Sequence, residues 1–172
     1  MEKILLHLKT IVPTKIVKEA MALYGTCETP GTKDNKIILS WARDLGIFWY
    51  DHDSIPWCGL FMATVVNRAG YKVVKNPLAA LSWKEFGIGV PIPEFGDIVV
   101  LTRDGGGHVA IYIGESSDSY YLLGGNQSDM VNIKRLSKSR AVAFRRPPYK
   151  MIPKTVKRYY FTNEGELSVD EA

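Results

Sequence analysis

The chain has 172 residues, of which 46% are hydrophobic and 23% are charged, enough for the core of one ordinary domain and too little for two full ones. A formal charge of +4 and a pI near 9.0 predict a mildly cationic surface that suits an anionic partner. The charge does not choose between nucleic acid, an acidic membrane surface and a cell wall rich in carboxylates and phosphates.

The N-terminus and the cysteines set further limits. The apolar run at the N-terminus breaks by Lys9, too early for a signal peptide or a membrane span. Cys27 and Cys58 are too few for a disulfide framework in a chain of this length. We therefore expect a monomer that is synthesised in the cytoplasm without a signal peptide, keeps both thiols free and does not insert stably into a membrane.

Three helices are predicted in the N-terminal part of the chain. The first covers residues 14–24 and stops at Gly25; the second is capped by Asp34 or Asn35 and closes at Gly46. Between them lies a loop that holds Pro30-Gly31. The third begins at Cys58 and runs to Gly70, with a buried stripe at Met62, Val65, Val66 and Ala69. Cys58 therefore opens a core helix.

From Asp97 onward the hydrophobic period changes to short apolar or alternating runs that are separated by Gly, Ser and Asp turns. Five antiparallel strands are predicted, at residues 97–102, 108–114, 120–123, 130–136 and 140–145. Helices followed by strands predict an α+β fold, with the N-terminal helices packed on one face of a five-stranded antiparallel sheet. Residues 1–148 form the single domain, and 149–172 are a tail that is either a packed edge or partly disordered.

Cys58 and His108 are the candidate catalytic pair. A cysteine reacts as the thiolate, and the positive end of the helix that Cys58 opens is expected to lower its pKa. A nucleophilic thiol also needs a base, and His108 starts a predicted strand after Gly105-Gly106-Gly107, where no side chain obstructs the substrate. Either residue alone is more often structural, so the prediction rests on their shared context.

The third member of the site is predicted to be Asn126. It ends the strand after the one that His108 opens, so its amide can hold the imidazole tautomer. Glu115 and Asp129 are alternatives that fit solvated turns better. No cofactor is expected, and no metal, because Cys58 and His108 lack the further ligands and the spacing of a zinc site.

Several short segments of the chain resemble the NlpC and CHAP superfamily of cell-wall cysteine hydrolases, and most closely its phage-associated branch. The similarity covers roughly residues 16–146, although Trp57-Cys58-Gly59 stands where many members have Asp-Cys-Ser-Gly. The segments that carry the resemblance are Glu28-Thr29-Pro30-Gly31, Asp53-Ser54-Ile55-Pro56-Trp57-Cys58, Gly96-Asp97-Ile98-Val99-Val100, Gly107-His108-Val109 and Gly124-Gly125-Asn126-Gln127-Ser128-Asp129.

The resemblance implies a papain-like core and a thiol peptidase or amidase that acts on the peptidoglycan stem peptide without a cofactor, with Cys58, His108 and Asn126 as its catalytic residues. A phage endolysin that reaches the wall after release is the preferred reading; an injected antibacterial amidase toxin is the other. An acyltransferase on the same triad and a non-catalytic wall-binding module are the rival functions. A nucleic-acid binder is suggested only by the basic stretch 134–158 and is not expected. Which bond is cut is left open.

Overall fold

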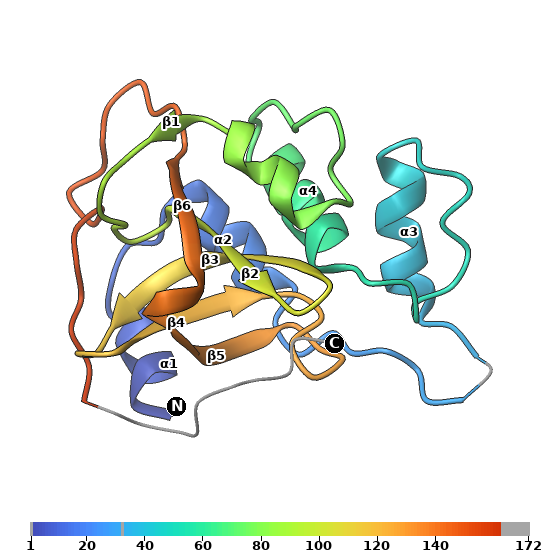
Figure 1. Ribbon diagram of the computed structural model, residues 1–172, viewed down its shortest axis with the longest axis horizontal. Helices are drawn as coiled ribbons and strands as arrows, with labels where there is room; N and C mark the ends of the chain where they lie inside the picture. The colour runs from blue at the N-terminus through green and yellow to red at the C-terminus, as the bar shows by residue number, and fades with distance from the viewer. Residues whose placement is uncertain (1, 32, 163–172) are drawn as a thin grey trace.

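Helices and one antiparallel sheet make up the part of the chain that the computed structural model describes, residues 2–31 and 33–162 (Figure 1). The helices are α1 (Glu2–Leu8), α2 (Lys15–Ala22), α3 (Lys36–Asp44) and α4 (Cys58–Arg68), followed by the 3-10 helix η1 (Ala80–Glu85). The strands are β1 (Ile88–Gly89), β2 (Ile98–Arg103), β3 (Gly106–Glu115), β4 (Ser119–Gly124), β5 (Asn132–Ser137) and β6 (Ala141–Arg146), and the short 3-10 helix η2 (Lys138–Arg140) precedes β6.

The predicted α+β class is confirmed, and so are the three N-terminal helices. Asn35 is the cap of α3, where its side chain accepts a hydrogen bond from the backbone N–H of Ile37 at 2.8 Å. Gly25, Gly46 and Gly70, the predicted stops, all have a positive φ, a conformation that glycine adopts at little cost. The helix α1 has no counterpart among the predicted elements.

The sheet has six strands in the order β1-β6-β2-β3-β4-β5, so the prediction of five is wrong by one. The additional strand is β1, whose two residues pair with Arg145 and Arg146 of β6. Two residues are too few to show an alternating pattern, which is why the sequence does not reveal this strand. The predicted runs correspond to β2 to β6. However, β3 begins at Gly106, so His108 lies within the strand, opposite Leu101 of β2, rather than at its end.

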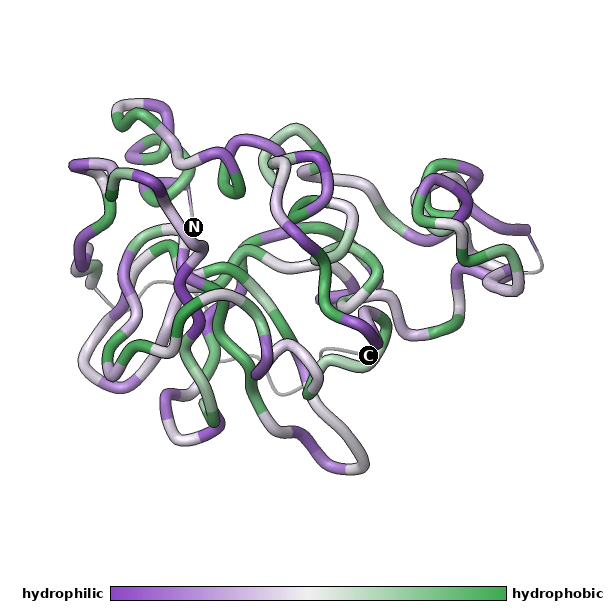
Figure 2. Tube along the Cα trace, turned by 90° about the horizontal axis from the view of Figure 1, so that it is seen from above, coloured by the Kyte–Doolittle hydropathy of each residue, from purple (hydrophilic) through white to green (hydrophobic). Residues whose placement is uncertain are grey.

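Two hydrophobic cores lie on the two faces of the sheet. The larger contains α4, which is buried at every residue from Cys58 to Val66, together with inward side chains of α2, α3 and alternate residues of β2 and β3. The smaller one is built on the other face around Val99, Leu101 and Tyr112. Seen from above, hydrophobic stretches of the chain gather towards the middle of the molecule (Figure 2). Burial of α4 against β3 is what brings Cys58 next to the strand that carries His108.

Part of the predicted tail, around residues 159–161, lies along Glu115 at the end of β3. Phe161 donates its backbone N–H to the Glu115 carbonyl at 2.8 Å, and Glu115 donates its own to the Tyr159 carbonyl at the same distance. The Glu115 carboxylate, which is buried, accepts hydrogen bonds from Arg158 at 2.7 and 3.0 Å and from Lys138 at 2.6 Å. Residues 163–172 of the predicted tail lie outside the described residues. None of the described helices is both long and apolar enough to cross a membrane.

Candidate active site

Cys58 is the first residue of α4, and only 6% of its surface is exposed. Burial raises the pKa of its thiol, although hydrogen bonds to the sulfur from the backbone N–H groups of Val109, Gly59 and Cys58, and the charge of Arg103, act in the opposite direction. The expectation that the helix terminus gives Cys58 a lowered pKa is therefore wrong in its net direction. A thiol whose pKa is raised needs a base to become a nucleophile.

The backbone N–H of Val109, the residue that follows His108 in β3, faces the sulfur of Cys58. His108 is fully buried, and its Nε2 lies 3.0 Å from Oε1 of Gln127. Cys27, the other free cysteine, is exposed, so the two thiols stay separate as predicted. The structure thus places Cys58 against the backbone of β3, the strand that carries His108.

The amide of Gln127 determines which nitrogen of His108 carries the proton. Its Nε2 donates to the Asn132 carbonyl at 2.8 Å, to Asn132 Oδ1 at 3.0 Å and to the Leu122 carbonyl at 3.3 Å. With its nitrogen among acceptors, Gln127 turns only its oxygen to His108, and that oxygen must accept a hydrogen bond. His108 therefore carries a proton on Nε2, which leaves the basic lone pair on Nδ1.

The side-chain amide of Asn126 binds the segment at the start of α4. In the orientation that satisfies both amide atoms, its nitrogen donates to Glu28 Oε1 at 3.1 Å and its oxygen accepts from the backbone N–H of Trp57 at 3.2 Å. Glu28 also accepts from Trp57 Nε1 at 2.7 Å. The residue that orients His108 is thus Gln127, next in the chain. The prediction of Asn126 for this position is corrected by one residue.

The two alternatives to Asn126 also lie away from His108. Glu115, at the far end of β3, is buried in its ion cluster rather than solvated, and Tyr112 donates a further hydrogen bond to it at 2.7 Å. Burial acts to raise the pKa of Glu115, but the hydrogen bonds from Arg158, Lys138 and Tyr112 outweigh it and lower the pKa to about 2. Asp129 is exposed in the turn after Gln127, as expected for a solvated residue. Neither carboxylate serves the histidine.

The loop with Pro30-Gly31 is tied to the segment that leads into Cys58. Asp53, which is buried, accepts hydrogen bonds from the backbone N–H groups of Thr29 at 2.9 Å and Asn35 at 2.7 Å. Its own N–H donates to Asp34 Oδ1 at 3.0 Å. These bonds position Glu28 against Trp57 and, through it, the first turn of α4.

The glycine run before His108 has a packing role that the sequence does not reveal. A Cβ on Gly107 would lie 2.7 Å from Cδ2 of Leu81, so the side chain of Leu81 in η1 occupies the space that was expected to remain open for substrate. Gly105 has a φ of +74° at the turn between β2 and β3.

Comparison with known proteins adds no relative: neither a scan against protein-family models nor a search of the curated proteins gives a match. Within residues 2–31 and 33–162, no group of three or more His, Cys, Asp or Glu side chains is arranged to hold a metal ion. The chemistry that the geometry itself supports is that of a thiol nucleophile with an imidazole base and an amide that orients it.

Proposed function

We propose that this protein is a papain-like cysteine hydrolase that cuts an amide or peptide bond in the stem peptide of peptidoglycan, with Cys58, His108 and Gln127 as its catalytic triad. The observation that carries this proposal is the hydrogen bond between His108 and Gln127. It leaves the basic lone pair on Nδ1 of a buried imidazole, in the strand whose next residue, Val109, turns its backbone N–H to the thiol of Cys58 at the start of α4.

In the proposed reaction, His108 Nδ1 takes the proton of the Cys58 thiol as the sulfur attacks the carbonyl carbon. The backbone N–H of Cys58 stabilises the oxyanion of the tetrahedral intermediate. The intermediate collapses to a thioester as Nδ1 returns the proton to the leaving amine. A water molecule then attacks the thioester and gives its proton to Nδ1, which passes it back to the sulfur as the carboxylic acid leaves.

The substrate class is inferred from charge and from the resemblance to cell-wall hydrolases. The net charge of +4 favours a polyanionic partner, and the wall supplies carboxylates and phosphates at high density. The Pro-Gly loop, the helix-opening cysteine and the strand histidine all follow in the order found in that superfamily. Both lines support peptidoglycan as the substrate and an endolysin as the biological role.

Digestion of purified peptidoglycan tests this proposal. Wild-type protein is expected to release free amines and fragments of defined mass, and Cys58→Ala is expected to release none. Cys27→Ala is the matched control, because it removes an exposed thiol and is expected to leave the activity unchanged. Full activity in a folded Cys58→Ala variant would rule out the thiol mechanism. Fragments that carry a transferred acyl group instead of a new carboxylate would identify an acyltransferase on the same triad.

A further inference from the structure

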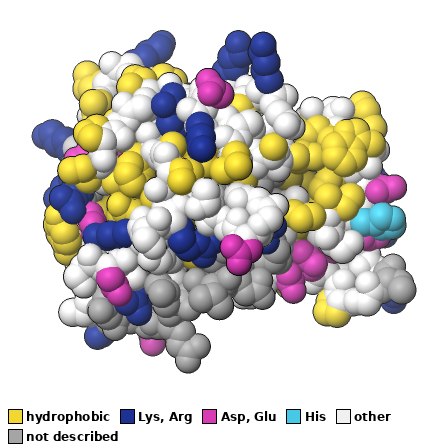
Figure 3. All heavy atoms as spheres, viewed as in Figure 1, with side chains coloured by type: hydrophobic (Ala, Val, Ile, Leu, Met, Phe, Trp, Pro, Cys, Tyr) yellow, Lys and Arg dark blue, Asp and Glu magenta, His cyan; other side chains and the backbone are white. Residues whose placement is uncertain are grey.

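An open groove of about 620 Å³ lies beside α4, between the segment that follows α3 and the segment 71–78. Its lining includes Ile47 and Trp49 from the segment after α3, which form one wall, and Lys72 and Lys75 from the segment 71–78, which form the other. Asn67 of α4 also lines it. Figure 3 shows hydrophobic side chains gathered on the right of the molecule, where α3 and the residues after it lie. The volume is in the range of ligand sites in proteins.

Trp49 differs from the other tryptophans near the site in its exposure. Trp57 and Trp83 are fully buried, whereas 67% of Trp49 is exposed. A large exposed aromatic in a groove costs hydration energy without adding to the core, which is typical of a surface that meets a partner. The flat indole face suits the apolar C–H face of a sugar ring.

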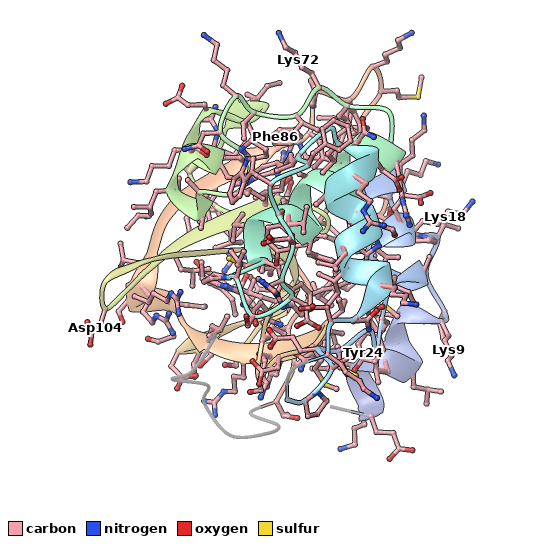
Figure 4. The ribbon with its side chains drawn as sticks, turned by 90° about the vertical axis from the view of Figure 1, so that its right-hand side faces the viewer. Lys9, Lys18, Tyr24, Lys72, Phe86 and Asp104 are labelled. Atoms are coloured by element: carbon pink, nitrogen blue, oxygen red, sulfur yellow. The ribbon has the colours of Figure 1, made fainter. Side chains whose placement is uncertain are left out.

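The opposite wall supplies positive charge. Lys72 and Lys75 are exposed, and within the described part of the chain neither ammonium group forms an ion pair. Figure 4 shows Lys72 projecting outward at the top of the molecule. The only carboxylate that lines the groove is that of Asp44. An amide at Asn67, two ammonium groups and an indole together match a chain of N-acetylated sugars that carries carboxylates.

The groove is connected to the catalytic residues through both of its walls. The ring of Trp49 packs against that of Tyr50, with centroids 6.4 Å apart, and the buried Tyr50 donates from its hydroxyl to the Ile55 carbonyl at 2.6 Å. That bond fixes the segment that leads into Cys58. On the other wall, the carbonyls of residues 77 and 78 pack so closely on Gly59 that no Cβ would fit there.

From these observations we propose that the groove binds the glycan strand of peptidoglycan, with Trp49 stacked on a sugar ring and Lys72 and Lys75 facing carboxylates of the attached stem peptides. This inference rests on the proposed function for its choice of ligand. It assigns the groove the task of holding the polymer while a stem peptide of the same strand reaches Cys58. We expect the groove to lower KM for polymeric substrate rather than to raise kcat.

Binding is measured in the Cys58→Ala background, so that the probe stays intact. The probes are an uncharged N-acetylglucosamine oligosaccharide and a soluble peptidoglycan strand that keeps its stem peptides. Trp49→Ala is expected to weaken binding of both probes at least about fivefold. The double variant Lys72→Ala, Lys75→Ala is expected to weaken binding of the charged strand only. This loss of affinity should diminish at high salt. Phe48→Ala is the matched control, since Phe48 is 80% exposed and does not line the groove.

Wild-type protein that binds neither probe would overturn the inference. So would a Trp49→Ala variant that binds the probes within twofold of the parent affinity, or a Phe48→Ala variant that loses as much affinity as Trp49→Ala. A dimer that dissociates on Trp49→Ala would assign the surface to self-association instead. The two proposals fail separately: Trp49-dependent binding without any hydrolysis by wild type refutes the enzyme and leaves the glycan site standing. Hydrolysis whose KM for the polymer is unchanged by Trp49→Ala refutes the glycan site alone.

Discussion

Replacing Gln127 tests the triad most directly. Gln127→Ala removes the oxygen that accepts the Nε2 proton of His108 at 3.0 Å. When His108 becomes an imidazolium in the proposed reaction, this hydrogen bond becomes one to a charged group, worth about 1.5–3 kcal/mol. Since 1.4 kcal/mol is a tenfold change, kcat/KM for amine release from peptidoglycan should fall roughly 10- to 150-fold.

The neighbouring substitution Asn126→Ala is the matched comparison, because both residues lie in one turn and both are buried. Asn126→Ala leaves the backbone N–H of Trp57 without its acceptor, and a buried orphan donor costs about 1–3 kcal/mol. We expect that cost to lower the free energy of unfolding in urea, with a smaller loss of kcat/KM than in Gln127→Ala. If folded Asn126→Ala is the less active of the two variants, the assignment of Gln127 is wrong.

Three further predictions follow from the buried groups. Glu115 has a folded-state pKa of about 2 against an ordinary 4.5, so its stabilisation is complete above pH 4.5 and is lost as the pH falls towards 2. In urea titrations at pH 7, Glu115→Gln should lower the free energy of unfolding by about 1.5–3 kcal/mol, after allowance for solvent screening of its partly exposed partners. A difference in unfolding free energy from wild type that does not shrink at pH 3 would contradict this. Gly125→Ala places a Cβ 2.5 Å from Phe61 Cβ and 2.7 Å from the Trp57 ring. This overpacking should lower the free energy of unfolding by about 1–3 kcal/mol in the same assay. An unchanged urea midpoint would refute this prediction. Because burial raises the pKa of Cys58, its alkylation by iodoacetamide should have a midpoint above the ordinary thiol value, and a midpoint below pH 7 would instead indicate a resting thiolate.

Local sequence signals predict the helices α2, α3 and α4 and the strands β2 to β6, although they miss α1. Periodic apolar residues, the Asn35 cap and the glycine stops act within a few residues of chain, so they are visible without a fold. The two-residue strand β1 is different, because it forms only by pairing with β6, which comes much later in the chain. Elements that depend on a distant partner leave no local pattern.

The sequence by itself determined the α+β class and proposed the pairing of Cys58 with His108, since a residue that opens a helix and a histidine in a strand can be recognised from their own surroundings. The tertiary structure alone decided that Gln127, and not Asn126, orients the imidazole. Asn126, Ser128 and Asp129 all have positive φ, and in such a turn successive side chains point in directions that no periodicity describes. It also decided the resting state of the thiol, because the burial that raises the pKa of Cys58 comes from packing between elements that lie far apart in the chain.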